Sequence, residues 1–196
     1  MLAVIVALSA PALAANPLVA VRSLVPDAVL DVRYATPRNF VGRALYPYPA
    51  AFLRRSTAAR LAKAADLLRA EGLRLVIFDA YRPLSVQRAM WKAKPDGRFV
   101  ADPARGSRHN RGGAVDLALA GKDGKPLPMP SDFDAFGPDA APGAKGVPPR
   151  AAADARRLRA AMVKAGFTPL STEWWHFGDP DAVRWPLLDV PLEDLR

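Results

Sequence analysis

GSRHNRGGAVDLAL, residues 106–119, joins a histidine to a short apolar segment through two adjacent glycines. The segment 114–119 has the composition of a strand, and the twofold period of a strand places Asp116 on a face otherwise lined by alanine. A straight chain would point His109 away from Asp116, but Gly112 and Gly113 permit a sharp turn. We therefore expect both side chains to converge on one point. The alternative is a surface histidine near an unrelated strand-edge aspartate.

The second histidine of the chain, His176, lies in STEWWHF, residues 171–177, and the chain has no third. Glu173 precedes it by three positions, so the two side chains meet only if this aromatic strand bends. Two tryptophans between them predict a water-poor wall, which raises the pKa of a glutamate towards the range of a general base. A core strand with an incidental His and Glu is the alternative.

Two histidines and one aspartate form a three-ligand set that suits Zn²⁺ and leaves a fourth position for water. The chain contains no cysteine, which excludes disulfides, thiolate metal sites and a cysteine nucleophile. A nearby glutamate that is not a ligand accepts the proton of the water. The pattern is typical of a zinc hydrolase, with His109, Asp116 and His176 as ligands and Glu173 as base.

The segment FDAYRP, residues 78–83, ends a β-branched and aromatic run. Its position predicts that Arg82 points into a cleft, where a guanidinium stabilises an oxyanion or binds a substrate carboxylate. Asp79 is placed to hold Arg82 through a bidentate pair, or the two form only a strand-end salt bridge. Ser107 is either a turn serine or a hydrogen-bond donor to the substrate.

Helices and strands are interspersed without regular alternation, which predicts an α+β fold in one domain. Ser56 or Thr57 is expected to cap the first helix. The expected helices cover 56–72, 84–94 and 150–166. The expected strands are 29–34, 73–79, 114–119 and 171–177, and long loops are expected at 95–113 and 121–150.

The first fifteen residues, MLAVIVALSAPALAA, carry no charged side chain and end in a small-x-small pattern. They predict a signal peptide at 1–15, followed by a mature domain at 16–196 in an exported, periplasmic protein. The run is too short to span a membrane as a helix. The net charge of +9 comes from dispersed basic residues, without the clustering typical of nucleic-acid binders, so no nucleic-acid partner is expected.

Five segments together resemble one family, the zinc D-Ala-D-Ala peptidases. SRHNRGGAVDL (107–117) matches the family motif S-x-H-x-x-G-x-A-x-D, and EWWHF (173–177) matches E-x-W-H in the form of the D-alanyl-D-alanine dipeptidase branch. That branch includes the vancomycin-resistance dipeptidases. DVRYATPRNFVG (31–42), FDAYRP (78–83) and RRLRAAMVKAGF (156–167) are similar in order and spacing.

The resemblance implies a compact α+β domain with a central antiparallel sheet flanked by helices. It implies one zinc on His109, Asp116 and His176, with Glu173 as base and Arg82 as stabiliser of the transition state. The substrate would be the dipeptide D-Ala-D-Ala, cleaved to two D-alanines. Two alternatives stay open: a zinc D,D- or L,D-carboxypeptidase acting on longer peptidoglycan stems, and a non-catalytic envelope-binding protein whose structural zinc takes Glu173 as a fourth ligand.

The resemblance also implies that Tyr34, Asp79 and Ser107 shape the pocket around a very small substrate. One departure concerns Arg108, which stands where the vancomycin-resistance members have a second serine that helps to bind substrate. A long cation there is expected to contact the substrate and to alter recognition of its termini.

Overall fold

The computed structural model describes residues 17–195 of the 196-residue chain. Its strands are β1 (Leu18–Ala20), β2 (Val29–Leu30), β3 (Phe52–Arg54), β4 (Arg74–Asp79), β5 (Ala114–Ala120), β6 (Thr168–Pro169) and β7 (His176–Gly178), and its longer helices are α1 (Arg55–Arg69), α2 (Leu84–Ala93) and α3 (Pro149–Lys164). The predicted leader lies outside the described residues. Within those residues no helix is long and apolar enough to cross a membrane.

Five strands form the central sheet in the order β2-β4-β5-β7-β6, and β1 pairs with β3 in a separate two-stranded sheet. The neighbours from β4 to β6 are antiparallel, whereas β2 runs parallel to β4 at the edge. The predicted α+β class is confirmed, with one parallel pair in a sheet that is otherwise antiparallel. All residues of β5, the middle strand, are buried, as expected for a strand covered on both faces.

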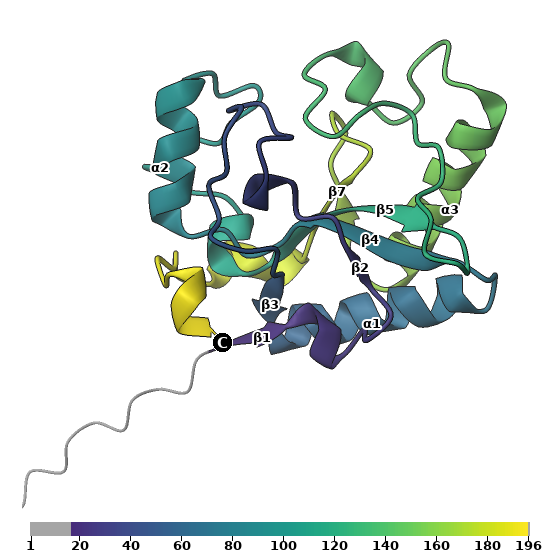
Figure 1. The fold of residues 1–196 in the computed structure, drawn as a ribbon, viewed down its shortest axis with the longest axis horizontal. Helices are drawn as coiled ribbons and strands as arrows, with labels where there is room; N and C mark the ends of the chain where they lie inside the picture. The colour runs from purple at the N-terminus through teal and green to yellow at the C-terminus, as the bar shows by residue number, and fades with distance from the viewer. Residues whose placement is uncertain (1–16, 196) are drawn as a thin grey trace, which may run out of the picture.

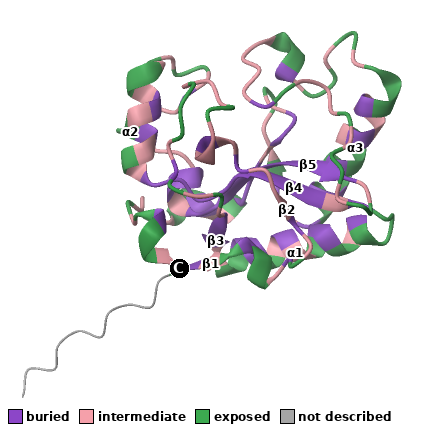
Figure 2. Ribbon diagram, viewed as in Figure 1, coloured by how far each residue is buried: buried purple, intermediate pink, exposed green. Residues whose placement is uncertain are grey.

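Helix α1 lies along one face of the sheet, while the long loops gather on the other side (Figure 1). α1 contacts α3 and β4, and α3 contacts β5 and β6. Burial follows this arrangement, because the central strands are buried and the exposed residues lie on the outer helix faces and loop tips (Figure 2). The side of the sheet that carries the loops is therefore the side available for a binding site.

The predicted helices are present with bounds shifted by a few residues, but the predicted cap of α1 is wrong. Arg54 occupies the N-cap position of α1, and no side chain caps the helix. Thr57 instead lies fully buried, and its hydroxyl donates to Asp179 Oδ2 at 2.9 Å. The hydroxyl stabilises a buried carboxylate on a distant segment, which satisfies a group that would otherwise be costly to bury.

Two predicted strands are shorter than their apolar patterns suggest. The strand predicted at 29–34 contains only β2, because the chain turns at residues 33–35 into a short 3-10 helix that buries Tyr34. Within the strand predicted at 171–177, β7 begins only at His176, and residues 171–175 form a loop. This loop supplies the bend expected between Glu173 and His176.

The double glycine forms the expected turn. Gly112 adopts a left-handed conformation with φ +68°, immediately after the single 3-10 turn His109–Arg111. A Cβ placed on Gly113 would collide with Ala182 and lie 2.9 Å from the Trp185 ring. Gly112 therefore meets a conformational need, whereas Gly113 meets a packing need.

Because the space at Gly113 is filled, Gly113→Ala is expected to lower the free energy of unfolding by about 1–3 kcal/mol, the usual cost of overpacking. Gly97→Ala is the matched control, since an added Cβ there has no heavy atom within 4 Å. Urea unfolding followed by circular dichroism measures both. Equal stability of the two variants would contradict the close packing at Gly113.

Candidate metal centre

The sheet places two of the predicted ligands directly side by side. Asp116 on β5 and His176 on β7 are register partners, and Asp116 Oδ1 lies 2.8 Å from His176 Nδ1. His109 reaches the same point from the 3-10 turn before β5, with its Nε2 3.2 Å from His176 Nδ1 and 3.4 Å from Asp116 Oδ1. The three ligand atoms form the one cluster of metal-binding type found among the described residues.

This cluster fits a tetrahedral zinc ion. Ligands placed 2.0–2.1 Å from zinc at tetrahedral angles lie roughly 3.3 Å apart, close to the observed separations. His109 Nδ1 lies 2.6 Å from the Ala80 carbonyl oxygen, which accepts its N–H and so leaves Nε2 free for the metal. His109 and Asp116 are each 3% exposed. A divalent cation would offset the charge of the buried Asp116 carboxylate and would bind the lone pairs of the two imidazoles.

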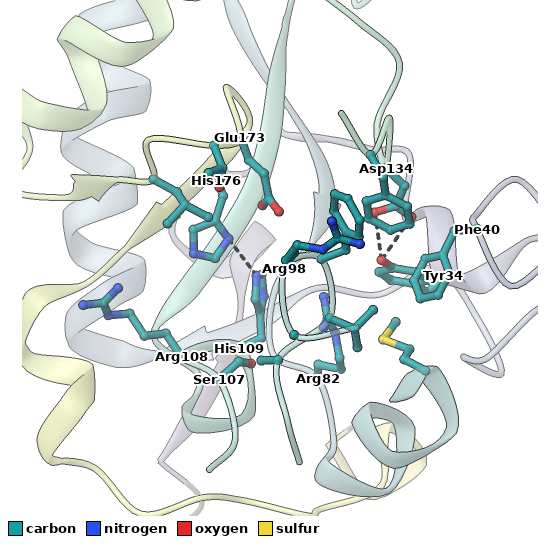
Figure 3. A pocket seen from close by; sticks show the side chains of 18 residues that line it. Tyr34, Phe40, Arg82, Arg98, Ser107, Arg108, His109, Asp134, Glu173 and His176 are labelled. Carbon is teal, nitrogen blue, oxygen red and sulfur yellow. Dashed lines mark hydrogen bonds between the residues drawn. The ribbon is translucent and has the colours of Figure 1, made fainter. Parts of the chain in front are cut away.

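Glu173 lies beside the cluster without belonging to it. Its side chain lines the same cavity as His109 and His176, a space of about 340 Å³, and Figure 3 shows it next to His176. Burial, and then the charge of Asp116, raise the pKa of Glu173 to about 7. A carboxyl group with such a pKa, close to a metal site, is suited to take up and release a proton near neutral pH.

Arg82 enters the cavity from the turn after β4 and is held from behind. Asp79 Oδ2 accepts hydrogen bonds from Arg82 Nη2 at 2.6 Å and Nε at 3.0 Å, and Gln87 Oε1 accepts from Nη1 at 2.8 Å. Tyr46 in turn donates to Asp79 Oδ1 at 2.6 Å. Because these buried groups fix its plane, the guanidinium is pre-oriented for an anionic partner.

The structure brings most of the predicted site residues to one cavity and leaves Asp79 out. Asp79 is fully buried behind Arg82, so it positions that residue and does not contact a ligand. The predicted residues that line the cavity are Tyr34, Arg82, Ser107, Arg108, His109, Glu173 and His176. Asp116, which is buried next to the two imidazoles, belongs to the same cluster as the third candidate ligand.

A carboxylate that sequence reasoning missed faces the cluster from across the cavity. Asp134 belongs to the long loop after β5, has a left-handed backbone with φ +61°, and accepts the Tyr34 hydroxyl on both carboxylate oxygens at 3.1 Å (Figure 3). Burial, and then the charge of Asp116, raise the pKa of Asp134 to about 7. Among the described residues it forms no ion pair within 4 Å.

Comparison with known proteins agrees with this chemistry. The family model described as D-ala-D-ala dipeptidase, Peptidase_M15, matches residues 14–193. The chain belongs to this family. It is 39% identical to the D-alanyl-D-alanine dipeptidase of Escherichia coli K12 over 83% of this chain and 84% of the relative. It is 32% identical to the enzyme of the same name from Enterococcus faecium, over 75% of this chain and 83% of that protein.

Solved structures give more distant matches to this Peptidase_M15 chain. VanYB in complex with D-Alanine-D-Alanine aligns with a TM-score of 0.42 and 20% identity, over 66% of this chain and 72% of the other. A point mutant of the vancomycin-resistance D,D-pentapeptidase VanY, in complex with Zn(II), aligns with a TM-score of 0.40 and 21% identity, over 74% of this chain and 85% of the other.

Removal of one ligand is expected to release the metal. Asp116→Ala leaves only two imidazoles, so the zinc content of the purified protein should fall from one per chain to below a tenth of that value. Asp134→Ala is the control, because Asp134 lies across the cavity and should retain the metal. Atomic emission on dialysed protein measures both. Full zinc content in the Asp116 variant would exclude this cluster as the metal site.

Proposed function

We propose that this Peptidase_M15 chain is a zinc-dependent dipeptidase that hydrolyses D-Ala-D-Ala to two D-alanines. The observation that carries the proposal is the placement of Glu173, with its raised pKa, beside the cluster of His109, Asp116 and His176 in one cavity. The family match and the names of the relatives support the same activity. The acid opposite the cluster, Asp134, supports a short substrate with a free amino group.

The three ligands would hold zinc in the buried cluster, and zinc supplies Lewis acidity towards a carbonyl oxygen and acidifies water. Glu173 accepts the proton of the attacking water and then delivers it to the amine that leaves. Its position in the same cavity as His109 and His176 places its carboxylate within the site for both transfers.

Arg82 stabilises the negative charge that develops on the scissile carbonyl oxygen. Its guanidinium is kept rigid by Asp79 and Gln87, so little reorganisation is needed when that charge appears. The ring of Tyr34 lies 5.2 Å from the Arg82 guanidinium carbon and covers one face of it. This arrangement leaves an N–H edge for the oxyanion.

The two ends of the cavity are suited to the two ends of a zwitterionic dipeptide. Asp134, without an ion pair among the described residues, would accept the substrate ammonium group, and Tyr34 fixes the carboxylate for that contact. Ser107 and Arg108, on the cluster side of the cavity, would bind the substrate carboxylate (Figure 3). Arg108 packs its Cδ and Nε against Gly178 of β7, so its contact with the carboxylate would come from the part of the side chain that lines the cavity.

Loss of the base tests the mechanism. Glu173→Gln keeps the shape of the side chain but cannot accept a proton, so kcat for D-Ala-D-Ala should fall by a factor of about 10³ or more while zinc is retained. D-alanine release and metal content are measured on the same preparation. Substantial turnover with bound zinc would remove Glu173 from the role of base.

Asp134 separates a dipeptidase from a carboxypeptidase that acts on longer stems, because only a dipeptide presents an ammonium group at this point. Asp134→Asn should raise KM for D-Ala-D-Ala tenfold or more with a smaller effect on kcat, since asparagine also tolerates the left-handed backbone. Asp132→Asn, an exposed acid of the same loop, is the control. A pentapeptide stem hydrolysed better than the dipeptide by the wild type would favour the carboxypeptidase.

We further propose that residues 1–15 act as a signal peptide and that the enzyme works in the periplasm on peptidoglycan-derived dipeptide. The uncharged run and its small-x-small end support this proposal. A fusion of residues 1–20 to a reporter that is active only after export tests it. Export should be lost when Val6→Arg interrupts the apolar run, and a reporter that remains inside the cell with the natural leader would contradict it.

A further inference from the structure

A second cavity of about 370 Å³ lies beside the one that holds the metal ligands. The two cavities share five lining residues and therefore meet along one boundary. The shared residues are Arg98, Phe99, Phe136, Thr172 and Glu173. The proposed base, Glu173, is one of these shared residues. A substrate bound at the metal ligands could therefore extend part of its structure into the second cavity.

The walls of the second cavity are largely apolar. Phe99 and Phe136 stack with ring centroids 4.8 Å apart, and Lys94 Nζ lies 5.0 Å from each ring and steadies the pair. Trp175, Ala140 and Ala141 also line this cavity. Burial of an apolar group against such a surface is favourable. A polar group would lose its hydrogen bonds to water there and find few new partners.

The charged side chains of this cavity lie only at the boundary. Arg98 is paired with Asp96, with Arg98 Nη2 2.6 Å from Asp96 Oδ2, and Glu173 faces the metal cluster. The remaining lining, from residues 135–141 and from Trp175, carries no charged side chain. The interior is therefore not built to hold a charged substituent.

Chain connectivity indicates which end of the substrate reaches this cavity. Asp134, the proposed ammonium site, is followed directly by residues 135–141, most of which line the second cavity. Ser107 and Arg108, the proposed carboxylate contacts, line the first cavity only. The side chain next to the second cavity thus belongs to the residue that carries the ammonium group.

We propose that the second cavity is a side-chain subsite that accepts a bulky apolar side chain on the amino-terminal residue of a D,D-dipeptide. The inference rests on the proposed dipeptidase function and widens its substrate class from D-Ala-D-Ala to D-aminoacyl-D-alanines such as D-Leu-D-Ala. Specificity at this position then depends on the polarity of the side chain and not only on its size.

Matched substrates test the subsite. D-Leu-D-Ala and D-Asn-D-Ala carry side chains of nearly equal shape, one apolar and one polar. The wild-type zinc enzyme should hydrolyse the leucine dipeptide with a kcat/KM at least fivefold higher, since the polar amide would lose water without a new partner. A smaller preference in an enzyme that does hydrolyse D-Ala-D-Ala would overturn the subsite and leave the proposed function intact.

A variant that fills the cavity tests its location. Ala141→Leu should lower the ratio of kcat/KM for D-Leu-D-Ala to that for D-Ala-D-Ala at least fivefold, because the new side chain occupies the subsite. Ala155→Leu is the matched control: Ala155 is also half-buried and lines a separate apolar cavity beside α3. A change of less than fivefold in folded Ala141→Leu, or an equal change in the control, would overturn the assignment.

Binding without turnover separates the two proposals. Calorimetry on Glu173→Gln should give a Kd for D-Leu-D-Ala at least fivefold lower than for D-Asn-D-Ala. If that preference is found while the wild type releases no D-alanine from D-Ala-D-Ala, the proposed reaction fails and the subsite stands. This measurement also needs no cavity-filling variant, so it decides the question even if Ala141→Leu fails to fold.

Discussion

The register between β5 and β7 is the constraint on which the rest of the site depends. It sets Asp116 directly opposite His176, with 2.8 Å between Oδ1 and Nδ1. A slip of one residue would turn one of these side chains to the other face of the sheet. The glycine turn before β5 then brings the third candidate ligand, His109, into the same buried cluster.

A second layer of buried polar groups keeps the site rigid. Behind the cavity, Asp79 and Gln87 accept hydrogen bonds from Arg82, and Tyr46 donates to Asp79. Gln87 Nε2 also donates to the Ala101 carbonyl oxygen at 2.8 Å. Buried charges are stable only when they are paired and hydrogen-bonded in this way. Through Gln87 the same network ties the guanidinium to the cavity wall that carries Ala101.

The predictable parts of the structure are those with strong local signals. Helix α1 follows from the apolar stripe formed by residues such as Leu61, Ala64 and Leu68, which the structure buries. The convergence of His109 and Asp116 follows from the two glycines between them. Asp134 and Asp79 show where such reasoning ends. Asp134 lies in a Pro- and Ala-rich loop without periodicity, so only tertiary packing places it opposite the metal cluster. As a carboxylate next to Arg82, Asp79 was expected to help to bind the substrate. Its buried partners show that it positions Arg82 instead.

The prediction of a side-chain cap for α1 was wrong for a related reason. Ser56 and Thr57 are suited to capping by type, yet the buried Asp179 lies 122 positions away from Thr57 in the chain and competes for its hydroxyl. Local propensity gives way when a distant buried carboxylate needs a donor. The short strand before Tyr34 likewise reflects the packing of that ring beneath the cavity, with Tyr46 at a centroid distance of 5.9 Å.

The central claim is that a zinc ion held by His109, Asp116 and His176 is required for dipeptide hydrolysis. The most direct measurement follows D-alanine release from D-Ala-D-Ala before chelation, after chelation, and after titration with Zn²⁺. Activity should be lost with the metal and return in full at one zinc per chain. Hydrolysis that continues in metal-free protein would contradict the claim.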